Sequence, residues 1–369
     1  MENHTLFVGL DVSKKTISVA IAPSDPQLAV SFYGTIAYHP DALRKLGRKL
    51  SKDGLYLHFC YEAGAFGYGL QRSLQELGHR CDVVAPSLIP QRPGDRVKTD
   101  RRDAITLASC LRAGQLTPVW IPDERHEAMR TLVRLRRLAV ADVRRAKQQI
   151  LSFCLMHGRD YTGRKNWTKS HRHWLVGQKF DHAALSFSYA ELLQRLERAE
   201  AMLTRVRAEL KDTLPTWELY PVVEALTALR GFEWENAATL VAEIGDFSRF
   251  AGAGQLMSYV GLVPSEASTG ETCRRGRITR MGNAVARTAL IEAAWSYRYP
   301  AKLSYKIRER AAHLPEPIRM TAWNAQRRLC ARMRHLHRQG KKTNMATTAI
   351  ARELAGFVWS LAQMAPNMT

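Results

Sequence analysis

The order of strand and helix signals in residues 5–115 most restricts the fold of this chain. Three short apolar runs come first, at 5–13, 16–23 and 29–38, and they predict a meander of antiparallel strands. Helix and strand patterns then alternate, and the segment closes with a helix that ends near Gly114. Three strands followed by alternating helix and strand is the order of a ribonuclease-H-like α/β domain.

Four carboxylates stand at the ends of these predicted elements. Asp11 ends the first strand, Glu62 ends a later one, and Asp100 and Asp103 share one face of the closing helix. Mg²⁺ prefers oxygen ligands, and two such ions about 4 Å apart can clamp the attacking and leaving oxygens of a phosphodiester. The order of the four residues therefore predicts an acidic site that holds Mg²⁺, with two ions per site, and cuts nucleic acid.

Each part of this pattern also has a plainer interpretation. A D-x-x-D pair on a helix is usually a solvated face, although the basic surroundings of Asp100 and Asp103 argue against that. Asp82 lies inside a predicted strand and Asp95 lies in a loop. We therefore interpret Asp82 and Asp95 as structural residues.

The charge balance indicates the partner. Lys and Arg number 55 against 34 Asp and Glu, which gives a net charge of +21. Such an excess attracts polyanions, most often nucleic acid, and a ribosomal or membrane-surface protein is the plain alternative. No segment reaches the roughly 18 apolar residues of a membrane span, and the N-terminus lacks a signal-peptide pattern, so we expect a cytoplasmic protein with no membrane partner. Six dispersed cysteines without a CxxC pair argue against a zinc site or a disulfide framework.

The middle of the chain, residues 121–215, has helical heptad spacing. One seam follows Leu192, Leu196, Ala199, Leu203, Val206 and Leu210. An upstream seam begins at Ala128, Leu132, Leu135 and Ala139, and its spacing slips before Ala146 and Ile150. We expect two long helices that form a coiled-coil hairpin or an oligomer contact.

Basic and aromatic residues interleave between these two helices, at 157–180. Cations suit phosphates, and tyrosine or tryptophan rings can stack on bases. The alternative is a solvated loop whose tryptophans dock on the helices, and the pattern does not separate the two. The nucleic-acid contacts expected here are Arg164, Lys165, Trp167 and Lys169.

Residues 216–369 are expected to form a mostly helical third domain, after an α/β domain over 1–120 and the coiled-coil region over 121–215. Residues 222–250 indicate a helix, a Gly-containing turn and a helix, as in a helix-hairpin-helix element. The polar, Gly-rich and basic segment 261–283 is too long for a simple connection, so we expect it to be functional.

Several motifs together resemble a known family. GLDVSK, YEAGAFGYGL and VKTDRRDA are similar to the DEDD-type transposases of bacterial insertion sequences, in the insertion sequence one-ten family. ALRGFEWENAATLVAEIGDFSRF, QLMSYVGLVPSEASTGE and RRGRITRMGNAVARTALIEAAW extend the resemblance over nearly the whole chain. It implies a RuvC-like domain whose Asp11, Glu62, Asp100 and Asp103 bind Mg²⁺. It also implies a structured guide RNA, called a bridge RNA, that selects target and donor double-stranded DNA, and a homo-oligomer that is a dimer of dimers.

The same resemblance implies a nucleophilic serine in the C-terminal domain. The family's serine precedes a glycine in a Ser-Ser-Gly or Ser-Thr-Gly segment, which here is Ser268-Thr269-Gly270, so Ser268 is the expected nucleophile and Ser265 a weaker rival. By spacing alone, Ser268 is a turn or helix-cap serine. The cations expected to neutralise phosphates near the two sites are Lys98, Arg101, Arg102, Arg274, Arg275, Arg277 and Arg280.

Three functions are consistent with these patterns. The first is an RNA-guided recombinase that forms a transient phosphoserine–DNA link. The second is a RuvC-like, metal-dependent junction endonuclease in which water attacks and no covalent intermediate forms. The third is a non-catalytic RNA-binding scaffold. Substitution of Ser268 distinguishes the recombinase from the endonuclease. Substitution of Asp11 distinguishes both enzymes from the RNA-binding scaffold.

Overall fold

The computed structural model of the protein describes residues 5–52, 54–90, 99–269 and 272–365. The chain forms two compact units, Met1–Ile121 and Pro122–Thr369, and each is described by itself. The predicted coiled-coil region and the predicted C-terminal domain both fall within the second unit. The division of the chain into three domains stays a prediction.

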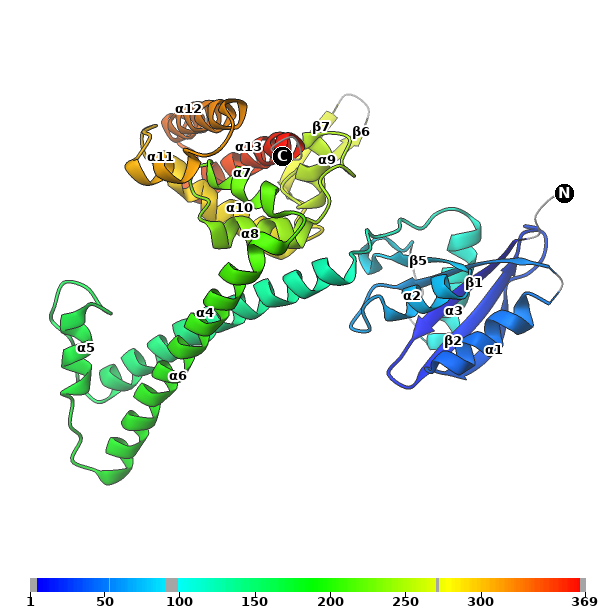
Figure 1. Ribbon diagram of the computed structural model, residues 1–369, viewed down its shortest axis with the longest axis horizontal. Coiled ribbons are helices and arrows are strands. Elements are labelled where there is room, and N and C mark those ends of the chain that lie inside the picture. The colour runs from blue at the N-terminus through cyan, green and yellow to red at the C-terminus, as the bar shows by residue number, and fades with distance from the viewer. Residues whose placement is uncertain (1–4, 53, 91–98, 270–271, 366–369) are drawn as a thin grey trace. The chain divides into compact units, whose positions relative to one another are not determined.

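A five-stranded mixed sheet forms the centre of the first unit (Figure 1). β1, β2 and β3 are antiparallel neighbours, which confirms the predicted meander, whereas β4 and β5 continue from β1 in parallel. The strand order is β3-β2-β1-β4-β5. The strands are β1 (Thr5–Val12), β2 (Thr16–Pro23), β3 (Ser31–Ala37), β4 (Tyr56–Glu62) and β5 (Arg80–Val84).

Helices cover both faces of this sheet. α1 (Pro40–Leu50) and α2 (Gly69–Glu76) pack on one face, where their leucines join the buried side chains of alternate strand residues. α3 (Asp100–Arg112) covers the opposite face with Ala104, Ala108 and Leu107. A short 3-10 turn, η1 (Pro86–Leu88), follows β5.

Gly9 lets α3 approach β1 closely. A Cβ at Gly9 would lie 2.4 Å from both the carbonyl oxygen of Ala104 and the backbone nitrogen of Ala108. At the other end of the helix, Arg112 donates to the carbonyl oxygens of Leu28 at 2.8 Å and Pro23 at 3.5 Å, and Pro23 pairs with Leu6 at the start of β1. α3 therefore runs antiparallel to β1, and its first turn lies toward the carboxyl end of that strand.

We expect Gly9→Ala to destabilise the first unit by about 2–3 kcal/mol, because the added methyl group overlaps backbone atoms that cannot rotate away. Urea unfolding monitored by circular dichroism measures the change. Gly69→Ala is the matched control, since nothing lies within 4 Å of a Cβ there and the residue begins a helix. Equal stability of the two variants would contradict the close packing of α3 on β1.

Two long helices begin the second unit and pack against each other: α4 (Glu124–Met156) and α6 (Ala183–Thr213). The helices are antiparallel, because Val133 of α4 shares a core with Leu210 of α6 while Cys154 shares another with Tyr189. The predicted helical hairpin and the seam on α6 are confirmed. On α4, however, Ala128 is exposed, and the buried residues begin with His126 and Met129. The short α5 (Lys169–Val176) lies in the connection between the two helices.

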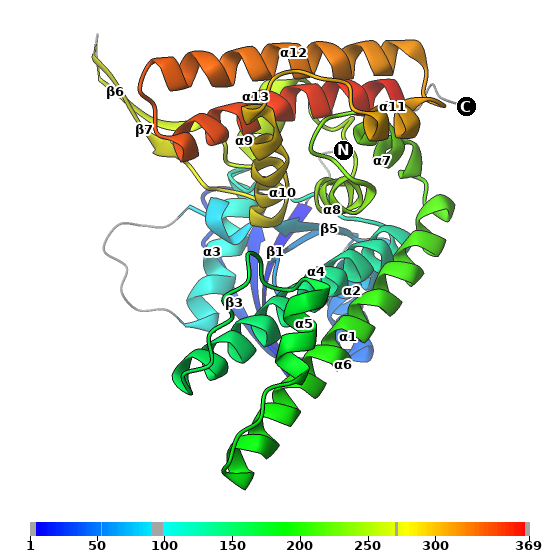
Figure 2. The same ribbon diagram turned by 90° about the vertical axis from the view of Figure 1, so that its left-hand side faces the viewer.

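The rest of the second unit is mostly helical and has one large core (Figure 2). All but two residues of α8 are buried, so α8 occupies its centre. The predicted helix, turn and helix are confirmed as α7 and α8. Gly231 lies in the turn between them. A Cβ at Gly231 would lie 2.3 Å from the carbonyl oxygen of Ala293, so the close packing there leaves room only for a glycine. The helices are α7 (Tyr220–Thr227), α8 (Trp234–Ile244), α9 (Ala253–Tyr259), α10 (Ala284–Ala294), α11 (Tyr305–Ala311), α12 (Glu316–Arg338) and α13 (Thr343–Met364), with 3-10 turns η2 (Leu214–Thr216) and η3 (Trp295–Arg298).

The segment 261–283 contains an antiparallel β-hairpin rather than an irregular loop. β6 (Pro264–Thr269) pairs with β7 (Thr272–Ile278), and Figure 1 shows the two strands extending from the helical body of this unit. Nearly every residue of both strands is exposed. Within the described ranges, no helix is long and apolar enough to cross a membrane.

Candidate functional site

Three of the four predicted acidic residues lie at one edge of the first unit's sheet face. Gly9 and Cys60 are register partners on the face covered by α3, and Asp11 and Glu62 lie two residues further along the parallel strands β1 and β4 on that same face. Asp103 directly precedes Ala104, whose carbonyl oxygen would contact a Cβ at Gly9. Both strand ends and the first turn of α3 are thus brought to one edge, where these three carboxylates are half-buried.

Asp100 begins α3 and is exposed, one turn from Ala104. Thr99 caps this helix, because its hydroxyl oxygen accepts a hydrogen bond from the Arg102 backbone nitrogen at 3.4 Å. Carboxylates in the first turn also complement the positive end of the helix dipole. The sequence therefore places the Asp pair where the helix itself favours negative charge.

All four side chains are oxygen donors, which fits Mg²⁺. Among the described residues, however, no three acidic, histidine or cysteine side chains lie close enough together to hold a metal ion. The carboxylate oxygens at this edge are suitable ligands for Mg²⁺, but the described side chains do not form a complete coordination shell. The acidic metal site stays a prediction.

Asp82 has a structural partner. Its carboxylate lies 2.8 Å from the Nε2 atom of His58 on the neighbouring strand and also contacts Arg80. Burial lowers the pKa of His58 more than the bond to Asp82 raises it. The Asp82 carboxylate is therefore engaged within the sheet, in agreement with its interpretation as structural; Asp95 lies outside the described residues.

The cations predicted beside the acidic site are Lys98, Arg101 and Arg102. The Arg101 guanidinium lies 5.2 Å from the centre of the Phe32 ring, and Arg101 and Arg102 are both exposed. Lys98 lies outside the described residues. Their role as nucleic-acid contacts stays a prediction.

Aromatic rings between α4 and α6 pack around His171 rather than projecting into solvent. His171 is fully buried, its ring is 5.1 Å from that of Trp167 and 4.7 Å from that of Tyr161, and it stacks on Trp174 at 5.7 Å. The Nδ1 atom of His171 accepts a hydrogen bond from the Trp167 backbone, and burial lowers the His171 pKa. This packing favours the docked-tryptophan alternative for Trp167, while Arg164, Lys165 and Lys169 remain exposed.

Ser268 lies on the exposed β6–β7 hairpin with a carboxylate beside it. Its hydroxyl donates a hydrogen bond to Oε1 of Glu266 at 2.8 Å, two residues earlier on the same strand. Glu266 also contacts Nε of Arg275 on β7 at 3.5 Å. The hydrogen bonds from Ser268 and from the Cys273 thiol, followed by the charge of Arg275, hold the pKa of Glu266 below its usual value. The carboxylate is therefore ionised at neutral pH.

The two predicted serines lie differently on this hairpin. The Ser265 hydroxyl lies beside Gly276 of the opposite strand, where a Cβ would approach it to 2.4 Å. Ser268 is the register partner of Cys273, and the next pair along the strands is Ala267 with Arg274. The cations that follow on the exposed strand β7 and just beyond it include the predicted Arg274, Arg275, Arg277 and Arg280.

A buried network supports the base of the hairpin. The Glu243 carboxylate, whose side chain is fully buried, receives two hydrogen bonds from Arg134 at 2.8 and 2.9 Å and one from Asn283 at 2.7 Å. Asn283 in turn caps α10, since its oxygen accepts from the backbone nitrogens of Val285 and Ala286. The network links α4, α8 and α10, and sequence analysis missed it because its members are far apart along the chain.

We expect Glu243→Gln to destabilise the second unit by roughly 2–4 kcal/mol at neutral pH, because a buried charge pair loses one partner while Arg134 stays half-exposed. Burial raises the pKa of Glu243, but the bonds from Arg134 and Asn283 outweigh it and leave the pKa lowered. A carboxyl group with a lowered pKa stabilises the fold above its unfolded pKa and loses this contribution as the pH falls through the folded pKa. Urea unfolding should thus show a wild-type advantage that shrinks in acid; an advantage that grew in acid would contradict the assignment.

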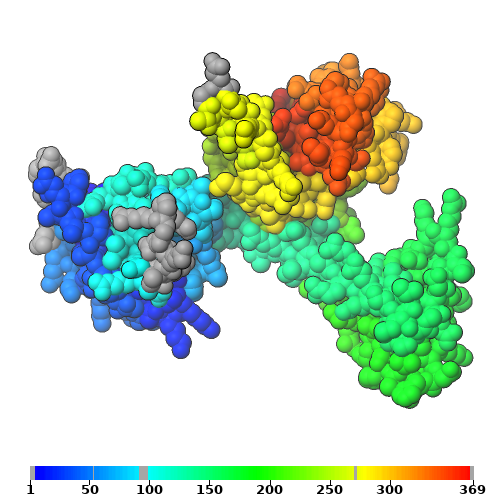
Figure 3. Space-filling model, turned by 180° about the vertical axis from the view of Figure 1, so that it is seen from behind, coloured from blue at the N-terminus to red at the C-terminus, as the bar shows by residue number. Residues whose placement is uncertain are grey.

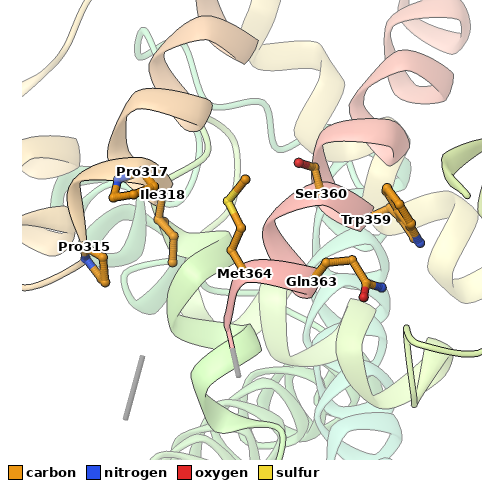
Figure 4. Close-up of a pocket in the computed structure, with 7 residues that line it drawn as sticks. All are labelled: Pro315, Pro317, Ile318, Trp359, Ser360, Gln363 and Met364. Carbon is orange, nitrogen blue, oxygen red and sulfur yellow. The ribbon is translucent and has the colours of Figure 1, made fainter. Parts of the chain in front are cut away.

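A depression of about 330 Å³ lies elsewhere in the second unit, between the start of α12 and the end of α13 (Figure 4). Trp359 and Gln363 at its wall donate to the carbonyl oxygens of Phe250 and Phe247, so their polar atoms are already engaged. Among the residues that the structure describes, no ionisable side chain lines it, so these residues lack the groups that phosphodiester chemistry needs. Its lining residues are Pro315, Pro317, Ile318, Trp359, Ser360, Gln363 and Met364.

Sequence comparison agrees with this combination of an α/β domain and a helical C-terminal unit. A family described as "Transposase IS116/IS110/IS902 family" matches residues 223–308, and a DEDD transposase family of IS110 elements matches residues 8–156. Such matches define the class of protein as a transposase, an enzyme that acts on DNA.

Two relatives extend the similarity over the whole chain. "Putative transposase y4qE" of Sinorhizobium fredii is 46% identical over 98% of this chain and 90% of that protein. "Transposase for insertion sequence element IS1533" of Leptospira borgpetersenii is 29% identical over 91% of this chain and 98% of its own length. This chain therefore belongs to the IS110 family of insertion-sequence transposases.

Proposed function

We propose that this transposase cuts and rejoins DNA through a transient phosphoserine link to Ser268. The observation that supports this proposal best is the 2.8 Å hydrogen bond between the Ser268 hydroxyl and the ionised Glu266 carboxylate on an exposed, arginine-rich hairpin. A serine hydroxyl is a poor nucleophile unless a neighbouring group takes its proton. In this proposal, the neighbouring Glu266 carboxylate would accept the proton.

The step balances as a phosphoryl transfer. The Ser268 Oγ atom attacks the phosphorus, an Oγ–P bond forms, and the P–O bond to the departing DNA strand breaks. The proton of Ser268 passes to Glu266, and the departing oxygen takes a proton from water. In rejoining, a hydroxyl of the incoming strand attacks the same phosphorus and gives its proton back to the solvent, while Ser268 leaves and recovers its proton from Glu266. Bond energy is conserved, so no external energy source is needed.

Asp11, Glu62, Asp100 and Asp103 would hold Mg²⁺ on a ribonuclease-H-like, RuvC-like domain. When bound, Mg²⁺ would neutralise the charge that develops on the phosphodiester oxygens. The strand ends and the first turn of α3 position these carboxylates through the close packing at Gly9. Arg274, Arg275, Arg277 and Arg280 would hold DNA phosphates beside Ser268.

The proposal also includes a bridge RNA that selects the target and donor DNA by base pairing, and a homo-oligomer assembled as a dimer of dimers. The net charge of +21 supports a large polyanionic partner. The α4–α6 coiled coil offers a rigid element for assembly between copies. Arg101, Arg102, Arg164, Lys165 and Lys169 are the exposed cations proposed to contact nucleic acid.

A second candidate function is a metal-dependent junction endonuclease in which water attacks. The gathering of Asp11, Glu62 and Asp103 at one sheet edge favours it, because a two-metal acidic site can activate water without a serine. In that case Glu266 would only order the hairpin.

The test is the purified protein incubated with Mg²⁺, its co-purifying RNA and end-labelled duplex DNA. A denaturing gel should show DNA linked to protein, and mass spectrometry of the digested adduct should place the phosphate on Ser268. Sequencing of the co-purified RNA should recover one structured RNA encoded beside the gene. Full strand cleavage without any protein-linked DNA would instead establish the endonuclease, and random cellular RNA would overturn RNA guidance.

Glu266→Gln should slow adduct formation by about 10²-fold, in line with the loss of a proton acceptor. Glu266→Asp, which keeps a carboxylate, should retain more of the rate. The measurement is the single-turnover rate of adduct formation at saturating DNA. Equal rates in the Gln variant and the wild type would show that Glu266 does not take the proton.

A further inference from the structure

The region around α12 is exclusively basic. Residues 317–352 contain no Asp or Glu, although the whole chain has 34 acidic residues. The cations of this stretch are Arg319, Arg327, Arg328, Arg332, Arg334, Arg338, Lys341, Lys342 and Arg352. Nothing in the proposed chemistry at Ser268 or at the acidic site uses them.

One face of α12 is fixed to the core, which makes the helix a rigid support. The buried face consists of Ile318, Ala322, Ala325, Leu329, Met333 and Leu336. Arg327, Arg334 and Arg338 follow one another at spacings of seven and four residues on the opposite, exposed face. With a rise of 1.5 Å per residue, they form a row of about 17 Å. The orange atoms of α12 lie at the surface of the second unit in Figure 3.

The arginines of this row differ from their neighbours in having no acidic partner among the described residues. Arg328 and Arg332 on the flank of α12 lie 3.3 and 3.4 Å from the Glu353 carboxylate of α13. Arg327, Arg334 and Arg338 make no ion pair with any residue that the structure describes. Their charges are therefore left for an external partner or for solvent.

The end of α12 adds two further cations in a defined place. Gly340 adopts a φ of 70°, its nitrogen donates to His337 O at 2.9 Å, and the Lys341 nitrogen donates to Leu336 O at 3.1 Å. This pattern is a Schellman motif, which fixes the chain directly after the helix. Lys341 and Lys342 thus follow the last arginine of the row at the exposed end of α12.

Two local features of this corner weaken the fold. Arg334 and Arg338 are like charges at i and i+4, which destabilise a helix. Lys342 occupies the N-cap of α13 without a side-chain capping bond, where Ser, Thr, Asp or Asn is favoured and a cation opposes the helix dipole. Local preferences that are broken without a structural gain commonly mark functional surfaces.

We propose that Arg327, Arg334, Arg338, Lys341 and Lys342, the α12 basic row, bind the phosphate backbone of a nucleic-acid duplex. A straight row of unpaired guanidinium groups on a rigid helix suits regularly spaced phosphates. Asn324 and Ala331 lie beside the arginines, and between Arg327 and Arg338 no exposed residue of α12 is large and apolar, unlike a membrane-binding helix; the exposed Met320 and the partly exposed Trp323 precede the row on the same face. The row is a second duplex contact, distinct in sequence from the β6–β7 hairpin.

The test measures affinity of the full-length protein for a 30-base-pair DNA duplex and, separately, an RNA hairpin of about the same duplex length, over a range of NaCl concentrations. The triple variant Arg327→Gln, Arg334→Gln, Arg338→Gln should lower the slope of log K against log [NaCl] by about 3. The matched control Lys45→Gln, Arg48→Gln, Lys52→Gln removes equal charge from exposed positions on and after α1. The control should leave the slope unchanged, and thermal unfolding should confirm that both variants are folded.

A reduced slope with DNA alone assigns the row to DNA, a reduced slope with RNA alone assigns it to RNA, and a reduction with both assigns it to duplex phosphates in general. An unchanged slope with both duplexes, or an equal fall in the control, overturns the inference. The inference rests on the proposed function only in taking nucleic acid as the ligand. Ser268→Ala separates the two, because it should stop cleavage without changing the salt slope.

Discussion

Ser268→Ala is expected to abolish both DNA cleavage and the protein–DNA adduct, with a loss of at least about 10⁴-fold in the single-turnover rate. The variant removes the atom that forms the bond to phosphorus, and alanine leaves Glu266 without the hydroxyl that donates to it at 2.8 Å. Because Ser268 is exposed on β6, the variant should fold normally. Loss of activity would then report on chemistry rather than on stability.

Ser265→Ala provides the matched control on the same strand. The Ser265 hydroxyl lies beside Gly276 and, among the described residues, forms no hydrogen bond to Glu266, so its substitution should reduce the rate by less than about 10-fold. Both variants should bind duplex DNA as tightly as the wild type at equal salt concentration. Cleavage by Ser268→Ala at the wild-type rate would mean that water attacks the phosphodiester and that the junction endonuclease is the correct function.

The sheet of the first unit was predictable because its signals are local. Apolar runs of strand length, the turn after Asp11 and the closing helix ending near Gly114 each depend on neighbouring residues. The carboxyl ends of β1 and β4 then bring Asp11 and Glu62 together by parallel register alone. The depth of the α3 packing was not predictable, since it depends on a contact of Gly9 with Ala104 and Ala108 about 95 residues away.

The heptad seam on α6 was predictable for the same reason. The prediction for α4 was wrong at its first residue, Ala128. Ala128 is exposed, whereas Leu132 packs against the core beside the buried Met129 and Val133. The His126 ring and the Arg130 side chain both engage the carbonyl oxygen of Ala242 at 2.8 Å, which sets the rotation of α4 here. A tertiary contact thus overrides the periodicity of one helix.

The strands that carry Ser268 were not predictable from the sequence pattern. Residues 264–278 are polar and glycine-containing, so they indicated a loop, and the alternation typical of a half-buried strand is missing because both faces of the hairpin are exposed. Once the segment is a strand, residues two apart share a face, and Glu266 becomes the partner of Ser268. A search for carboxylates at i−2 and i+2 of the expected serine would have found it.

Asp11→Asn is the second change with a large expected effect, a loss of cleavage of at least about 10³-fold. Asparagine keeps the size of the side chain but removes its negative charge, so the donor set formed with Glu62, Asp100 and Asp103 is weakened toward Mg²⁺. Stability should change little, because Asp11 lies at the end of β1 beyond the packed contact at Gly9. Higher Mg²⁺ or Mn²⁺ concentrations should recover part of the rate if the defect lies in metal binding.

Asp41→Asn is the matched control, since Asp41 is exposed at the start of α1, on the opposite face of the sheet, and contacts Arg44 of that helix and His39 just before it. It should cleave at the wild-type rate. Binding of the co-purifying RNA should persist in both variants, because neither residue contributes positive charge. If Asp11→Asn cleaved DNA at the wild-type rate, the carboxylates at the edge of the sheet would have no role in the reaction. If neither the wild type nor any variant cleaved DNA with RNA and Mg²⁺ present, the chain would act as an RNA-binding scaffold, because only such a function leaves binding intact without needing the carboxylates or Ser268.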